Sequence, residues 1–134
     1  MKKIIFLSVC LLVCFNYVTR AQDDQGHLYI IELNTDNKNF VDQLRLDVLP
    51  GDSIQFKSTG GNFAIYIINA INFLALKEQD LKVWVNSDDP DKLTSPVYEV
   101  QSQAVDNPQY YYSIYCITDN SWPEAPPRII IKAE

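Results

Sequence analysis

Residues 48–56 of this 134-residue chain read Val48-Leu49-Pro50-Gly51-Asp52-Ser53-Ile54-Gln55-Phe56, and this stretch carries the clearest structural signal in the sequence. Pro50 and Gly51 at adjacent positions favour a tight reversal of the chain, in which the glycine supplies a positive φ. Apolar and polar residues alternate before the turn, over residues 44–48, and again after it, over residues 53–57. Because successive side chains of a strand point to opposite faces, the stretch predicts two half-buried strands joined by a turn.

The same alternation continues outward from this stretch through most of the chain. Clusters of Asn, Asp, Pro and Gly, which favour turns, separate the apolar segments at the short intervals typical of all-β domains. We expect strands over residues 27–33, 44–48, 53–57, 63–68, 81–85, 97–100, 110–117 and 128–132. Seven or eight short strands in one domain predict an all-β fold, a Greek-key β-sandwich or barrel.

Two segments add detail to this prediction. Residues 69–80 have apolar side chains at spacings that fit a helix about as well as a strand, and Asn69 is a possible N-cap, so we predict one short helix there. In the segment 110–117, alternation sends Tyr112 and Cys116 to one face, which we expect to be core, and Tyr115 to the other. That second face could form an aromatic platform for a partner or a sugar, although tyrosines that only cover a sheet are commoner.

The N-terminus has the pattern of a secretory signal peptide. Lys2 and Lys3 precede an apolar run from Ile4 to Val18, and small residues stand three and one positions before the expected cleavage site, with Ala21 last. A run of this length is shorter than the roughly 20 residues that span a bilayer as a helix, which makes a retained anchor the weaker interpretation. We therefore expect residues 1–21 to be removed, and residues 22–134 to be a single domain without membrane insertion, secreted or periplasmic.

Composition excludes several classes of function for that mature chain. Loss of Lys2, Lys3 and Arg20 with the signal peptide makes the formal net charge of −6 more negative still. Nucleic-acid binding depends on clustered basic residues, so no nucleic-acid partner is expected. The mature chain keeps one cysteine, one histidine and no methionine. It cannot form an internal disulfide or, by itself, supply a full set of soft ligands to zinc or copper.

Two stretches resemble the cupredoxins, the blue-copper β-sandwich family. The first is Val48–Phe56, which is similar to the family's recurrent V-x-x-G-D-x-[VI]-x-F segment, and the second is Tyr112–Cys116, which resembles the Y-x-[FY]-x-C strand of plastocyanin-like members. The order and separation of the two stretches agree with the family, so the resemblance covers roughly residues 44–132. It implies a cupredoxin-like Greek-key sandwich, and an immunoglobulin-like sandwich is the alternative.

The resemblance also implies where copper ligands would stand: two His, one Cys and usually an axial Met. Counted along the family pattern, the first His falls at about Ala64, the second at Asp119, and the Met near Glu124 or Ala125. Of this set only the cysteine, Cys116, is present. We therefore expect a domain without a type 1 copper site and without any cofactor.

The loop of residues 118–127 is the candidate binding site in this interpretation. It contains Asn120, Trp122 and Glu124 together with three prolines, and in the family the corresponding loop meets redox partners. No catalytic motif occurs in the sequence. The favoured function is thus an exported, non-catalytic binding domain for an unknown protein or glycan. A redox protein, carrying electrons through shared copper or through the thiol, and a structural subunit of a surface assembly are the alternatives.

Three further features are expected to be structural or incidental. Cys116 ends an apolar strand and is predicted to be a buried, unreactive thiol. The loop Asp88–Asp91, with Asn86 beside it, crowds oxygen ligands that could hold calcium, but it lacks the calcium-loop pattern and contains Pro90, so a solvated turn is the favoured interpretation. His27 is expected to be exposed, with no partner that would make it a general base.

Overall fold

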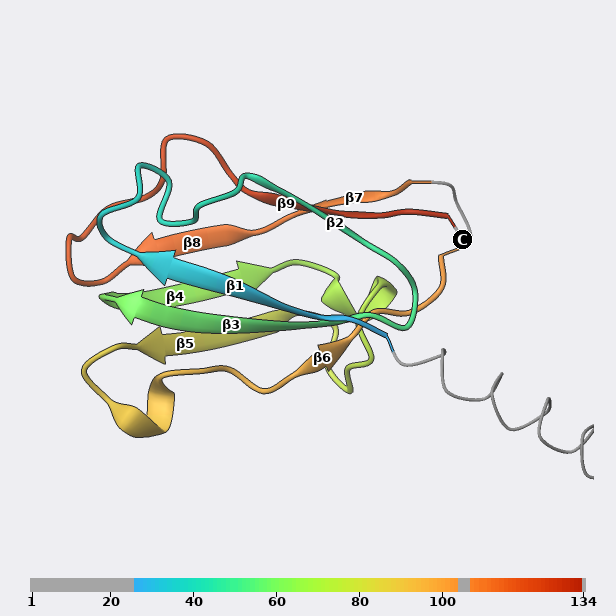
Figure 1. The fold of residues 1–134 in the computed structure, drawn as a ribbon, viewed down its shortest axis with the longest axis horizontal. Helices are drawn as coiled ribbons and strands as arrows, with labels where there is room; N and C mark the ends of the chain where they lie inside the picture. The colour runs from blue at the N-terminus through green and yellow to red at the C-terminus, as the bar shows by residue number, and fades with distance from the viewer. Residues whose placement is uncertain (1–25, 104–106, 134) are drawn as a thin grey trace, which may run out of the picture.

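Nine β-strands and two short 3₁₀ helices build the part of the chain that the computed structural model describes, residues 26–103 and 107–133 (Figure 1). The elements are β1 (Leu28–Asn34), β2 (Arg45–Val48), β3 (Ser53–Gly60), β4 (Asn62–Ile67), η1 (Ala70–Asn72), β5 (Leu81–Asn86), η2 (Pro90–Lys92), β6 (Tyr98–Glu99), β7 (Gln109–Tyr111), β8 (Ser113–Cys116) and β9 (Arg128–Ile131). Every strand predicted from the alternation is present, with ends shifted by a few residues. The predicted signal peptide, residues 1–21, lies outside the described residues.

The strands pair in an order that separates the two sandwich types expected from the sequence. One sheet has the order β1-β3-β6, and the others have the orders β2-β9-β7 and β5-β4-β8. Only Tyr112 separates β7 from β8, so these two three-stranded sheets follow one another along a single layer. β1 pairs with β3 in parallel, and β2 pairs with β9 in parallel. In an immunoglobulin-like sandwich the first strand lies beside the second, so that alternative is wrong.

The stretch 48–56 folds as its sequence predicts. Gly51 has φ 89°, so the turn uses the backbone conformation that glycine adopts most easily. Asp52, which follows it, is buried, and its carboxylate accepts hydrogen bonds from the backbone N–H groups of His27 and Leu49, both at 2.8 Å. The aspartate therefore closes the turn and also fastens the start of β1 to the start of β3.

The chain crosses from one layer to the other at Gly61. β3 and β4 are separated by this residue alone, yet they belong to different sheets. Gly61 has φ 120°, and a Cβ at this position would lie 2.7 Å from Cγ2 of Thr35. The Ser58 hydroxyl donates a hydrogen bond to the Gly61 carbonyl at 2.6 Å. This crossing places the outer face of β4 on the opposite side of the sandwich from β3.

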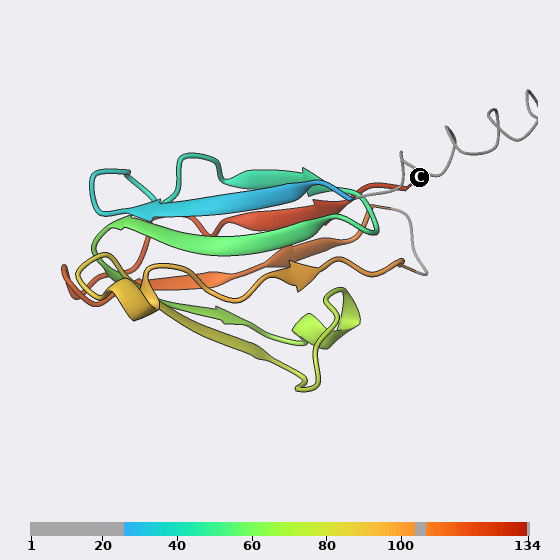
Figure 2. The same ribbon diagram turned by 60° about the horizontal axis from the view of Figure 1, so that its bottom comes forward.

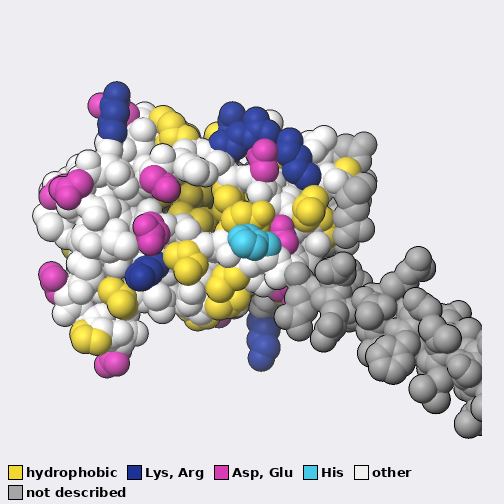
Figure 3. All heavy atoms as spheres, viewed as in Figure 1, with side chains coloured by type: hydrophobic (Ala, Val, Ile, Leu, Met, Phe, Trp, Pro, Cys, Tyr) yellow, Lys and Arg dark blue, Asp and Glu magenta, His cyan; other side chains and the backbone are white. Residues whose placement is uncertain are grey.

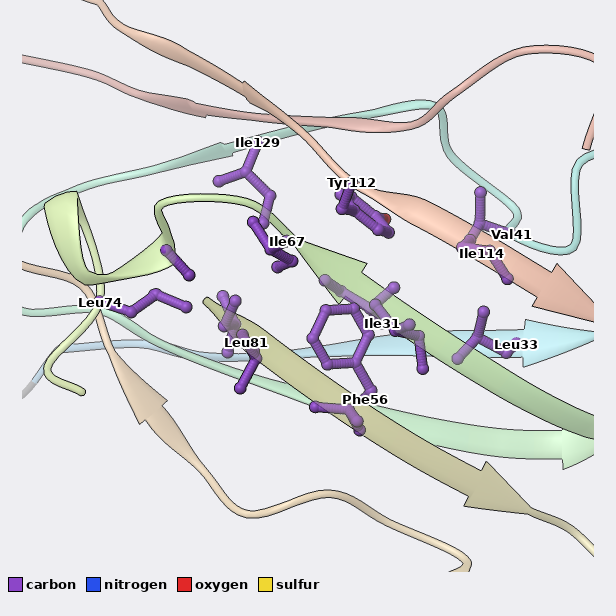
Figure 4. Packing of buried hydrophobic residues seen from close by; sticks show 14 of the residues in the cluster. Ile31, Leu33, Val41, Phe56, Ile67, Leu74, Leu81, Tyr112, Ile114 and Ile129 are labelled. Carbon is purple, nitrogen blue, oxygen red and sulfur yellow. The ribbon is translucent and has the colours of Figure 1, made fainter. Parts of the chain in front are cut away.

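Hydrophobic side chains from both layers fill the space between the sheets (Figure 4). Phe56, Phe63 and Ile114 are fully buried. The predicted faces of the segment 110–117 are confirmed, since Tyr112 is 3% exposed whereas Tyr111 is 54% exposed. Burial raises the pKa of the Tyr112 hydroxyl far above its ordinary value, with a smaller contribution from the charge of Asp42.

Two local predictions need correction. The segment 69–80 forms only the 3₁₀ turn Ala70–Asn72, and Asn69 stands before it in the left-handed region, φ 54°, without capping it through its side chain. Its apolar residues close one end of the sandwich, and Phe73 is fully buried there, which explains spacing that resembles a helix. The single strand expected over 110–117 is divided at Tyr112, whose N–H donates to the Pro127 carbonyl at 3.1 Å. None of the helices in the described residues is long and apolar enough to cross a membrane.

Candidate functional site

An apolar groove of about 500 Å³ runs over the outer face of the β5-β4-β8 sheet. Figure 2 shows β5 along the lower side of the sandwich, with η2 near one of its ends. Ten residues from the three strands and from the loop after β8 line the groove: Ala64, Ile65, Tyr66, Lys82, Val83, Trp84, Ser113, Tyr115, Ile117 and Trp122.

The strand register explains why this face is hollow. Ala64 on β4 is paired with Trp84 on β5 at one side and with Tyr115 on β8 at the other. Neighbouring strands lie 4.7–4.9 Å apart, so the two aromatic side chains rise from backbones about 10 Å apart with only a methyl group between them. This Trp84-Ala64-Tyr115 row, which we call the notch, therefore has a small side chain between two large aromatic ones, which leaves a hollow over Ala64.

Two neighbours hold the first wall of the notch, Trp84. Its indole N–H donates a hydrogen bond to Oδ1 of Asn62. The Nζ atom of Lys92, on η2, lies 3.8 Å from the centroid of the indole ring, within the range of a cation–π interaction. The side chain of Trp84 nevertheless remains 50% exposed. Its orientation is thus fixed while much of its surface stays open to solvent.

The second wall consists of Tyr115 and Trp122. Their ring centroids are 4.8 Å apart with an angle of 55° between the planes, and the Tyr115 hydroxyl donates to Oδ1 of Asn120. Trp122 is 64% exposed. The structure therefore brings Asn120 and Trp122, two of the predicted loop residues, to the groove. Glu124, the third, does not line the groove, because its carboxylate forms an ion pair with Lys38 at 2.9 Å.

Polar groups stand at the end of the groove marked by Tyr66. The Tyr66 hydroxyl donates to Oδ2 of Asp80 at 2.6 Å, and the Asn69 N–H donates to Oδ1 of Asp80 at 2.8 Å. The bond from Tyr66 is the main reason why the pKa of Asp80 lies below its ordinary value, and the same bond raises the pKa of Tyr66. The Nζ atom of Lys82 lies 5.8 Å from the centroid of the Tyr66 ring.

The positions expected to correspond to copper ligands are not brought together. Phe63, and not Ala64, pairs with Cys116, and both are fully buried. Ala64 lies on the outer face, in the notch. The Asp119 backbone N–H donates to Sγ of Cys116 at 3.4 Å, but the Asp119 side chain is exposed to solvent. Phe63, the neighbour of Ala64 on β4, faces the core instead, because successive residues of a strand point to opposite faces.

The surroundings of Cys116 do not fit a type 1 copper ion. His27, the single histidine of the sequence, precedes β1, and its carbonyl accepts a hydrogen bond from the N–H of Ser53, the first residue of β3. β3 has eight residues and is about 25 Å long. His27 lies beside its first residue, whereas Gly61, which follows its last residue, adjoins the end of β4 that pairs with Cys116. The histidine and the cysteine therefore lie toward opposite ends of β3. His27 is exposed and packs edge-on against Tyr29. Within residues 26–103 and 107–133, no group of three or more His, Cys, Asp or Glu side chains is arranged to hold a metal ion.

The acidic loop Asp88–Asp91 uses its polar groups to form a turn. Oδ1 of Asn86 accepts from the Asp88 N–H, and Oδ1 of Asp89 accepts from the Asp91 N–H, both at 3.0 Å. Asp89 is the N-cap of η2, with Pro90 in the first turn. These contacts account for the Asn86 and Asp89 side chains, as expected of a solvated turn.

A second, smaller hollow lies on the face that Figure 3 presents, where hydrophobic side chains gather around the histidine. Its volume is about 290 Å³. It is lined by Tyr29, Ile30, Ile31, Asp42, Gln43, Leu46 and Tyr112. Residues of β1 form one side, and the segment that leads into β2 forms the other.

Comparison with solved structures identifies the architecture. A variant of amicyanin in its reduced Cu(I) form at pH 4 superposes with a TM-score of 0.50 at 13% sequence identity, over 84% of this chain and 88% of that chain. The fold is cupredoxin-like. A second amicyanin variant with Cu(I) gives a TM-score of 0.47 at 15% identity with the same coverage. No protein-family model matches the sequence. No curated protein matches it either.

Four lining residues were not predicted from the sequence to belong to a site of this kind: Ala64, Tyr66, Lys82 and Trp84. Each occupies an alternate position of a predicted strand, on the face that the buried residues do not use. That pattern could have shown that they face outward. Which of them lie side by side depends on the pairing of β4 with both β5 and β8, which alternation does not reveal.

Proposed function

We propose that this chain is an exported, non-catalytic domain that binds glycans in the groove on the outer face of the β5-β4-β8 sheet. The observation that carries the proposal is the notch, in which Ala64 separates Trp84 from Tyr115. Aromatic faces are electron-rich. The C–H groups on the flat side of a sugar ring carry a slight positive charge, so a sugar ring packs well against such faces.

The size of the site supports a saccharide over a folded protein partner. A groove of about 500 Å³ falls within the range of small-ligand sites. A stable protein interface buries about 800 Å² on each partner, which is considerably more than this groove offers. The neighbouring Asn120 and Ser113 supply polar groups at the rim that can bond to hydroxyl groups.

The lining residues also support a binding role without catalysis. Among the ten residues that line the groove in the described part of the chain, none is Asp, Glu, His or Cys. Hydrolysis of glycosidic bonds ordinarily uses a pair of carboxyl groups across the bond. The copper alternative gains no support from the pairing of Phe63 with Cys116. Export by the N-terminal signal sequence would bring the domain to extracellular or periplasmic glycans.

The proposal is tested by screening the purified protein on a glycan microarray and measuring hits by calorimetry. Trp84→Ala and Trp122→Ala each remove one aromatic wall, and Ala64→Leu fills the notch. Each should weaken binding at least tenfold, the usual effect of removing a central aromatic anchor. Tyr111→Ala is the matched control, because Tyr111 is equally exposed but lies outside the groove.

The expected result is glycan binding that the three groove variants lose and the control keeps. Because Trp84 and Trp122 are at least half exposed, their removal should leave the unfolding midpoint nearly unchanged, which separates lost binding from lost folding. Absence of glycan binding, or binding that all three groove variants retain, would contradict the proposal.

A further inference from the structure

We infer that the groove selects anionic saccharides, whose rings carry carboxylate or sulfate groups, over neutral ones. This inference rests on the glycan-binding function proposed above and specifies the class of ligand. It is carried by the charge of the lining itself, because the charged side chain that lines the groove is a lysine although the chain as a whole is negative.

The chain has 17 acidic and 11 basic residues, so an average surface region of this protein is negative. Among the ten lining residues of the described chain, however, Lys82 is the single charged one. Lys92 adds a second ammonium group, since its Nζ atom lies over the Trp84 ring. The charged groups in contact with the β5 wall of the notch, Lys82 and Lys92, are therefore cationic, whereas the opposite wall, Tyr115 and Trp122, is uncharged.

Among the described residues, carboxylates lie near both lysines but form no short ion pair with either. Asp80, at the Tyr66 end, is close enough for the charge of Lys82 to help lower the pKa of its carboxyl group, and its two oxygens accept hydrogen bonds from Tyr66 and Asn69. Lys82 has no ion pair within 4.0 Å in the part of the chain that the structure describes. Lys92 has one partner, Asp89, at 3.9 Å, and a pair that long and that exposed contributes little.

The spacing allows one ligand to contact both the rings and the lysines. Lys82 and Trp84 lie two residues apart on the same face of β5, which separates their Cα atoms by about 7 Å. A ring held in the notch projects its substituents from its edge, within reach of the long Lys82 side chain. Lysine acts as a point charge, so a carboxylate or a sulfate at that edge satisfies it equally.

The test compares anionic oligosaccharides with neutral counterparts of the same ring skeleton. The first pair is trigalacturonate and its trimethyl ester, and the second is a sulfated galactan tetrasaccharide and its desulfated form. We expect each anionic member to bind several-fold more tightly than its neutral counterpart at low ionic strength. Lys82→Gln and Lys92→Gln should each reduce this preference about three- to fivefold, as expected for solvent-exposed charges. The preference is a ratio of two affinities for the same variant, so an effect of the substitution that is common to both ligands cancels.

Lys57→Gln is the charge-matched control, because Lys57 lies on β3 in the other layer. Equal affinity for both members of each pair would overturn this inference and leave the glycan-binding function standing. Absence of binding to every oligosaccharide would overturn both. Binding of polyglutamate without binding of any saccharide would assign the groove to an acidic protein segment and would also overturn the inference.

Discussion

Replacement of Asp52 by alanine should destabilise the protein considerably, although this residue is far from the proposed site. The buried carboxylate accepts two backbone N–H groups, from His27 and Leu49, each at 2.8 Å. A hydrogen bond to a charged group contributes about 1.5–3 kcal/mol. Both donors belong to exposed residues and can be partly hydrated after the change, so the lower value of about 1.5 kcal/mol applies to each hydrogen bond. The expected loss for the two bonds together is about 3 kcal/mol.

Urea unfolding followed by circular dichroism measures this loss. With an m value of about 2 kcal/mol per molar urea, the midpoint of Asp52→Ala should fall by about 1.5 M. Asp52→Asn keeps one carbonyl acceptor and should lose about half as much free energy. Asp47→Ala is the matched control, because it removes only exposed ion pairs, with Arg45 and Lys132, and should cost less than about 1 kcal/mol.

The reasoning would be refuted if Asp52→Ala unfolded within about 0.5 kcal/mol of the unmodified protein. It would also be refuted if the Asp47→Ala control had an effect of the same size. Either result would mean that the turn after β2 and the start of β1 do not depend on the Asp52 carboxylate.

Three other predictions concern stability and reactivity. Gly61→Ala should cost about 2–3 kcal/mol in urea unfolding, because φ is 120° and the added Cβ meets Thr35, and an unchanged midpoint would show that the crossing tolerates a side chain. Cys116 is fully buried and should react with a thiol reagent only as fast as the protein opens, so rapid labelling in the native state would revive the thiol-redox alternative. The pKa of Asp80 is lowered in the folded protein, chiefly by the hydrogen bond from Tyr66, so its contribution is present above the ordinary value of 3.8 and is lost as the pH falls through the lower folded value. The stability curves of Asp80→Asn and the unmodified protein should therefore differ at neutral pH and converge in acid, and parallel curves would contradict this assignment.

The strands were predictable because each obeys a local rule. Polar and apolar residues alternate across β3 and β5, and the Pro50-Gly51 turn is signalled by its own residues. The same alternation predicted that Tyr112 and Cys116 are buried. Such signals depend only on neighbouring residues in the sequence, so they can be recognised without knowledge of the tertiary structure.

The candidate site was less predictable because it depends on pairing between distant strands. Counting from Gly51 singled out Ala64, but it could not show that Ala64 pairs with Tyr115 while its neighbour Phe63 pairs with Cys116. The loop residue Trp122 was identified from the sequence, but its partner across the groove, Trp84, is 38 positions away in the chain. Only the sheet register joins them in one surface.

The most direct test of the central claim uses the indole groups of the two tryptophans of the chain, both of which line the groove. A two-dimensional ¹H–¹⁵N spectrum of the folded protein should contain two indole N–H resonances, from Trp84 and Trp122. Titration with trigalacturonate should shift both resonances along a single binding curve, while backbone resonances of β1 stay in place. Binding of the saccharide with neither indole resonance shifted would contradict the claim that the outer-face groove is the binding site.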